Sequence, residues 1–111
     1  MDINVIAVEK ATVVAIQGRL DALSAPSFDE QIVDILANST NGLVIDLSEL
    51  EYISSAGLRS ILKLIKLAPT QGKNVVICSL QPSVFSVFKI SGFASFLKIC
   101  DTRAQALELI L

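Results

Sequence analysis

The 111-residue sequence contains no histidine and only two cysteines. Histidine is the commonest general base in enzymes and a frequent zinc ligand, so its absence excludes most imidazole-dependent catalysis and most zinc sites. Cys78 and Cys100 lie in or beside the apolar runs 75–80 and 96–100, which is typical of reduced core thiols and not of a disulfide framework. We therefore expect no metal, no cofactor and no catalytic residue.

Long hydrophobic runs are also missing, although 52% of the residues are hydrophobic. No apolar run reaches the roughly 18 residues that a bilayer span requires. The segment after Met1 lacks the basic region, apolar stretch and cleavage site of a secretory signal. These absences predict a cytoplasmic protein without membrane insertion.

Phosphate-binding loops are absent too. No Gly-x-Gly-x-x-Gly and no glycine-rich loop ending in Gly-Lys-Thr or Gly-Lys-Ser occurs, which disfavours dinucleotide and P-loop chemistry. A pI near 4.9 argues against direct nucleic-acid binding, because that affinity depends on clustered Lys and Arg. The charge is nevertheless uneven, since residues 1–51 hold nine acids and two bases whereas residues 52–100 hold six bases and no acid. The sequence leaves open whether folding mixes these two halves or keeps a basic surface.

Hydrophobic periodicity predicts one α/β domain spanning residues 1–111, with a mixed sheet of roughly four to five strands covered by about four helices. Short β-branched runs predict an N-terminal hairpin, continuous apolar runs predict buried strands, and residues 93–99 are a candidate edge strand. The predicted strands are 3–8, 12–18, 42–47 and 74–80. The predicted helices are 24–36, 58–68, 82–91 and 102–111, with Ser24 as one N-cap and Thr102 with Gln105 as a capping box.

Residues 52–59 read Tyr-Ile-Ser-Ser-Ala-Gly-Leu-Arg and precede a predicted helix. The first turn of a helix has unpaired N–H groups and the positive end of the macrodipole, so it stabilises an anion. A serine nucleophile is disfavoured here, because the first glycine of Gly-x-Ser-x-Gly is missing and no imidazole is available. The segment is therefore a candidate position for a phosphorylation switch.

The motif of residues 43–48, Leu-Val-Ile-Asp-Leu-Ser, followed after five residues by Ser-Ser-Ala-Gly-Leu-Arg at 54–59, resembles the signature of the STAS domain family. That family includes bacterial anti-sigma-factor antagonists and transporter tails. Residues 18–21, Gly-Arg-Leu-Asp, and 91–93, Ser-Gly-Phe, resemble further turns of the family, so the resemblance covers nearly the whole chain.

In the family, the hydroxyl of an Asp-Ser-Ala-Gly-like motif is phosphorylated by a partner serine kinase that is itself an anti-sigma factor or a related switch protein. The resemblance implies this role for Ser55. Ser54 stands where the family usually has an acid, and it adds a second hydroxyl as the alternative site. On a helical wheel of about 100° per residue, Arg59, Lys63 and Lys66 fall on the side of Ser55, whereas Ser54 falls on the apolar side. We therefore predict modification of Ser55.

The resemblance implies a bacterial regulator of transcription that is not an enzyme. It would bind a serine kinase or anti-sigma factor when unphosphorylated, be released on phosphorylation, and be reset by a serine phosphatase. The expected partner surface comprises Asp21, Ser54, Ser55, Ala56, Gly57, Arg59, Lys63 and Lys66. A homodimer through the N-terminal strands is also compatible with the sequence.

Other readings stay open at this point. A STAS subunit that supports a transporter ATPase would use Ser55 structurally, and a module that senses a small ligand or nucleotide is a further alternative. Asp21 either contacts the Ser55 loop or a partner, or it caps the turn before Ser24.

Overall fold

The computed structural model describes residues 1–8 and 10–110. The strands are β1 (Asp2–Ala7), β2 (Thr12–Leu20), β3 (Gly42–Asp46), β4 (Leu50–Ile53), β5 (Asn74–Cys78) and β6 (Ile99–Cys100). The α-helices are α1 (Ala25–Asn38), α2 (Ser55–Leu67), α3 (Pro82–Ile90) and α4 (Arg103–Ile110). Two short 3₁₀ helices, η1 (Ala68–Gln71) and η2 (Phe93–Phe96), follow α2 and α3.

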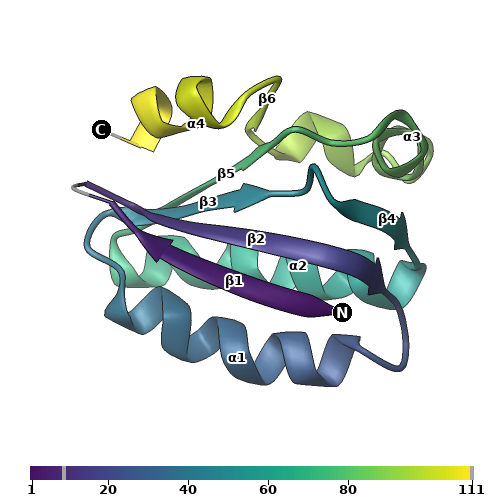
Figure 1. Cartoon of the computed structure of the whole chain (residues 1–111), viewed down its shortest axis with the longest axis horizontal. Coiled ribbons are helices and arrows are strands. Elements are labelled where there is room, and N and C mark those ends of the chain that lie inside the picture. The colour runs from purple at the N-terminus through teal and green to yellow at the C-terminus, as the bar shows by residue number, and fades with distance from the viewer. Residues whose placement is uncertain (9, 111) are drawn as a thin grey trace.

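A mixed sheet with the strand order β1-β2-β3-β5-β6 forms the centre of the molecule (Figure 1). β1 and β2 form the predicted antiparallel hairpin, whereas β2, β3, β5 and β6 run parallel to one another. β4 pairs in parallel with the C-terminal end of β2, residues 18–20. Helices α1 and α2 lie together on one side of the sheet, and α3 and α4 lie on the other side. The predicted α/β layers and four helices are confirmed, with six strands in the sheet instead of four to five.

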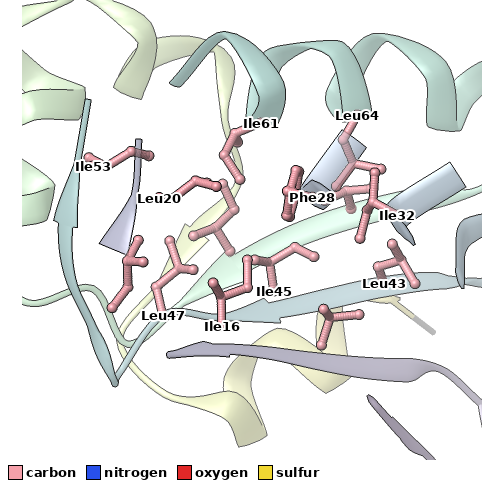
Figure 2. Packing of buried hydrophobic residues seen from close by; sticks show 14 of the residues in the cluster. Ile16, Leu20, Phe28, Ile32, Leu43, Ile45, Leu47, Ile53, Ile61 and Leu64 are labelled. Atoms are coloured by element: carbon pink, nitrogen blue, oxygen red, sulfur yellow. The ribbon is translucent and has the colours of Figure 1, made fainter. Parts of the chain in front are cut away.

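The core lies mainly between the sheet and the pair α1 and α2. All five residues of β3 are buried, as its continuous apolar run predicts. Figure 2 shows members of the cluster that the two helices and the sheet contribute, among them Phe28, Ile32, Ile45, Ile61 and Leu64. Burying each such side chain stabilises the fold by about 1.5–3 kcal/mol. A smaller cluster under α4 contains Val13, Val44, Val76, Ala106 and Ile110.

Three element predictions need correction. Residues 93–99 do not form an edge strand: Gly92 adopts a left-handed conformation (φ 79°), after which Phe93–Phe96 turns as η2 and only Ile99–Cys100 pairs with β5. The strand β4 is absent from the prediction because its burial pattern is neither alternating nor continuous. Helix α2 begins at Ser55 and not at residue 58, because its small first residues add nothing to the apolar period.

The two cysteines are neighbours in the parallel pairing of β5 with β6. Cys78 is fully buried and Cys100 is half-buried, and both are free thiols. Burial raises the pKa of the Cys78 thiol, which disfavours the reactive thiolate. Their placement agrees with the structural role expected from sequence.

An ion pair connects helix α4 to the sheet, in addition to the apolar cluster beneath the helix. Asp46, at the end of β3, accepts a hydrogen bond from Arg103 Nε through Oδ2 (3.0 Å), with Arg103 Nη2 2.8 Å from the same oxygen, and another from the Ser48 N–H through Oδ1 (2.9 Å). Burial raises the pKa of the Asp46 carboxyl, but hydrogen bonds from Ser48 and Arg103 outweigh it and lower that pKa. The predicted capping box adds a second restraint, because Gln105 N–H donates to Thr102 Oγ1 (3.1 Å) and Thr102 N–H donates to Gln105 Oε1 (3.3 Å).

We expect Asp46→Asn to lower the free energy of unfolding by about 1–3 kcal/mol near neutral pH, because the Arg103 charge loses its partner. A carboxyl whose pKa is lower in the folded state stabilises the fold above its unfolded-state pKa, and that contribution is lost as the pH falls through the folded-state pKa. The difference from the wild type should therefore shrink in acid. Urea denaturation at neutral and acid pH measures it, with Glu108→Gln, an exposed carboxylate on α4, as the control. An equal difference at both pH values would contradict the assignment.

Candidate functional site

The junction between β4 and α2 fixes the position of the two serines. The Ser54 N–H donates to the Leu20 carbonyl (3.0 Å), and the Ser54 carbonyl accepts from the Leu58 N–H (2.9 Å). The Ser54 hydroxyl accepts from the Gly57 N–H (3.3 Å), which makes this residue the N-cap of α2. Ser54 is half-buried, so its polar groups serve to hold the helix start against β2.

Ser55 is the first residue of α2 and is exposed. Its hydroxyl makes no hydrogen bond with any other residue that the structure describes. The N–H groups of Ser55 and Ala56 precede the first helical hydrogen bond, from Leu58 to Ser54, so they have no partner within the helix and can stabilise an anion. The structure thus leaves Ser55 exposed and Ser54 half-buried, and the identity of the modified residue stays a prediction.

Gly57 allows this helix start to approach β2 closely. A Cβ atom at this position would lie 2.4 Å from the Leu20 carbonyl oxygen and 2.9 Å from Leu20 Cγ. The backbone oxygen cannot move aside without shifting the β2 end. Gly57 is therefore required for the packing of α2 against the end of β2.

A groove of about 590 Å³ lies beside Ser55, between the start of α2 and the helix α3 with its following turn. Its apolar surface includes Leu58, Val87 and Phe93, and its polar surface includes Ser55 and Arg59. An apolar centre with a polar rim is the usual composition of a protein-binding surface. The sequence did not predict this groove, because residues of α3 approach α2 only through the tertiary fold.

A second cation lies near the groove and was missed from the sequence. Arg19 on β2 is the pairing neighbour of Tyr52 on β4, and its guanidinium carbon lies 4.1 Å from the centre of the Tyr52 ring. Tyr52 itself lines the groove. A stacked guanidinium of this kind is held in place by cation–π attraction. The Gly-Arg-Leu-Asp motif contains Arg19, but its placement depends on β4, which the sequence did not indicate.

Asp21 shapes the turn before α1. Its Oδ1 accepts from the N–H groups of Leu23 (3.0 Å) and Ser24 (3.2 Å), and its N–H donates to the Ser24 hydroxyl (2.9 Å). The backbone hydrogen bond from Ser24 is the main cause that lowers the pKa of the Asp21 carboxyl. This is the turn-capping alternative left open above. Ser24 occupies the predicted N-cap position of α1, but its side chain makes no capping hydrogen bond, because its hydroxyl donates to the Arg19 carbonyl (2.9 Å).

The basic residues of α2 divide between two surroundings. Arg59 lines the groove with Ser55, whereas Lys63 Nζ lies 3.5 Å from Asp29 Oδ2 on α1. Lys66 is exposed in the last turn of α2, away from Ser55. Folding therefore mixes part of the acidic N-terminal half with the basic segment, and the cations near Ser55 are Arg59 and, beside Tyr52, Arg19.

Two further properties concern the whole described structure. No group of three or more His, Cys, Asp or Glu side chains within residues 1–8 and 10–110 is arranged to hold a metal ion. In the same residues, no helix is long and apolar enough to cross a membrane.

The family model of the STAS domain matches residues 2–106. The chain belongs to the STAS domain family. A relative from Bordetella bronchiseptica, named as an anti-sigma factor antagonist (BtrV), is 36% identical over 95 residues, which cover 85% of this STAS domain chain and 81% of the relative.

Solved structures of STAS proteins share the fold. An anti-sigma factor antagonist from Mycobacterium paratuberculosis superposes with a TM-score of 0.88 at 23% identity, covering 98% of this chain and 92% of that one. The Bacillus cell fate determinant SpoIIAA in its phosphorylated form superposes with a TM-score of 0.73 at 15% identity, covering 99% and 100%. At these identities the likeness establishes the fold of the STAS domain, and the site is argued from its own geometry.

The different contacts of the two serines lead to a stability prediction. Ser54→Ala should lower the free energy of unfolding by about 1 kcal/mol, because it removes the N-cap hydrogen bond to Gly57. Ser55→Ala should change it by less than about 0.5 kcal/mol, because the exposed hydroxyl has no partner to lose. Urea denaturation of both variants measures the difference, and equal losses would contradict the assigned contacts.

Proposed function

We propose that this STAS domain is an anti-sigma-factor antagonist that binds a serine kinase or anti-sigma factor while Ser55 is unmodified and is released when Ser55 is phosphorylated. The observation that carries the proposal is the position of Ser55, exposed at the start of α2 on the rim of an apolar groove. The similarity to BtrV supports the antagonist role, and the existence of a phosphorylated form of SpoIIAA supports the modification.

The groove favours a partner that contributes an apolar side chain. Val87 and Phe93 are half-buried and Leu58 is buried, so the groove offers apolar surface without an internal occupant. Desolvated apolar centres carry most of the energy of protein interfaces, and surrounding polar groups exclude water. Unmodified Ser55 fits such a rim because its hydroxyl is small and uncharged.

A phosphate on Ser55 would leave the domain folded. It brings about −1.5 to −2 charges at neutral pH, placed beside the free N–H groups of the first turn of α2. Those groups stabilise an exposed anion by about 0.3–1 kcal/mol. Arg59, one helical turn further on the same face, is a second group that favours the anion. The unfavourable effect of the charge therefore falls on the bound partner.

Ser54, which stands where the family usually has an acid, changes the charge beside Ser55 more than it changes the start of helix α2. Ser and Asp are both good N-cap residues, and Ser54 makes the capping bond to Gly57. The change leaves the helix start intact and removes one negative charge beside the acceptor hydroxyl. We propose that the cognate kinase phosphorylates Ser55 although the preceding residue, Ser54, is uncharged. We also propose that a serine phosphatase in the cytoplasm removes the phosphate from Ser55.

Capture of partners from the native cells tests the antagonist role. Unphosphorylated protein should retain a serine kinase of the anti-sigma-factor type, and Val87→Asp should lose it because a charge enters the groove. Leu109→Asp, an exposed position on α4, serves as the control and should retain the kinase. Retention of an ATP-binding transport subunit in place of the kinase would contradict the proposal and favour the transporter role.

A further inference from the structure

The strand β1 forms one edge of the sheet, since among residues 1–8 and 10–110 it pairs with β2 alone (Figure 1). Natural edge strands are usually protected by Lys, Pro or a bulge, which hinder pairing with another chain. Residues 3–8 read Ile-Asn-Val-Ile-Ala-Val and contain none of these residues and no charge. Their pairing with β2 is regular from Asp2 to Ala7. The edge is therefore open to a further strand.

The hairpin fixes which backbone groups face this edge. The Val8 N–H donates to the Ala11 carbonyl (3.0 Å), which marks these two as a hydrogen-bonded pair. In an antiparallel pair, bonded and non-bonded positions alternate, so Asn4 and Ile6 bond to β2. The N–H and C=O groups of residues 3, 5 and 7 consequently point away from β2, toward the open edge.

Apolar side chains are exposed on both faces of the edge strand. Val5 pairs with Val14 on the face of α1 and is 50% exposed. Ile6 pairs with Val13 on the opposite face and is 43% exposed. A strand that is apolar on both faces is typical of the interior of a sheet and not of its edge.

We propose that β1 pairs antiparallel with β1 of a second copy of this chain, so that one sheet runs through both copies. The strand is self-complementary about Val5. With Val5 opposite its own counterpart, Ile3 lies opposite Ala7 of the second copy, and the outward N–H and C=O groups of residues 3, 5 and 7 bond to each other in both directions. In this register Asp2 lies opposite the uncharged Val8, so no like charges meet.

The self-complementary register is the reason to assign a second copy and not a different protein. A two-fold axis places the same surface on both sides and closes after two copies, which leaves no further edge of this kind exposed. None of the β1 residues lines the groove beside Ser55, so the dimer leaves that groove free. The inference is therefore independent of the proposed function.

The test is the mass in solution of the full chain and of two matched variants. The wild type should have twice the monomer mass of 11.9 kDa in multi-angle light scattering or sedimentation equilibrium. Val5→Lys should convert it to monomer, because a lysine on the edge strand opposes its own counterpart. Val33→Lys, the same change at a similarly exposed position (47%) on α1, should remain dimeric. Circular dichroism of each variant verifies that it is folded.

Amide hydrogen exchange tests the register without any substitution. The amides of Val5 and Ala7 should become protected as the protein concentration rises, whereas those of Asn4 and Ile6 should not change. A wild type that remains monomeric at its highest soluble concentration overturns the proposal and leaves the edge to a strand of a different protein. A folded Val5→Lys variant that remains dimeric also overturns the proposal. So does a wild-type dimer in which the amides of Val5 and Ala7 are not protected relative to those of Asn4 and Ile6.

Discussion

Phosphorylation of Ser55 should weaken binding of the partner kinase by about a thousandfold, which corresponds to about 4 kcal/mol. The unmodified hydroxyl lies on the rim of an apolar groove, where a bound partner would exclude water. A phosphate dianion on Ser55 can lose its water on binding, and it is then buried without a compensating positive charge from the partner. It can instead keep its water, and the hydrated phosphate then holds the domain and the partner apart. Both outcomes cost binding energy, while the N–H groups at the start of α2 preserve the folded state.

Titration calorimetry with the purified kinase measures this loss. Ser55→Asp approximates part of the added charge and should lower the affinity in the same direction, by a smaller factor. Ser27→Asp is a matched control, because Ser27 is an exposed serine in the first turn of α1, outside the groove. Equal affinities for the wild type and folded Ser55→Asp would contradict the switch.

Replacing Gly57 by alanine should lower the free energy of unfolding by about 2 kcal/mol, although alanine is the better helix former by up to about 1 kcal/mol. The added Cβ would lie 2.4 Å from the Leu20 carbonyl oxygen, so either α2 or the end of β2 must shift. The shift would also displace Ser55 relative to the groove. Partner affinity should therefore fall together with stability.

Urea denaturation measures the effect of Gly57→Ala. Ser55→Ala also places an alanine in the first turn of α2 but adds no contact, so it isolates the effect of helix propensity. An increase in stability for Gly57→Ala would show that β2 does not limit the approach of the helix.

Most of the fold followed from residue periodicity. The N-terminal hairpin, the buried strands β3 and β5 and the main part of each helix have the alternation or helical spacing that the sequence displays. The elements that periodicity did not predict are two short strands. Strand β4 holds an exposed pair, Glu51 and Tyr52, between two buried residues, and β6 spans two residues, so neither gives a periodic signal.

The candidate site was predicted only in part. The helical wheel applies to Ser55, the first residue of α2, and places it on the side of Arg59, but it does not apply to Ser54, whose backbone is extended at the N-cap (φ −94°, ψ 175°). The wheel could not predict that Lys63 would pair with Asp29 of another helix. Nor could it place Val87 and Phe93 in the same groove as Ser55, because that arrangement depends on how α3 packs in the tertiary fold.

Mass-spectrometric mapping of phosphate on the protein isolated from its native cells tests the central claim most directly. The account predicts phosphate on Ser55, an unmodified Ser54, and loss of the phosphate in Ser55→Ala. Phosphate on Ser54 with Ser55 unmodified, or none on Ser55 while the kinase is active, would contradict it.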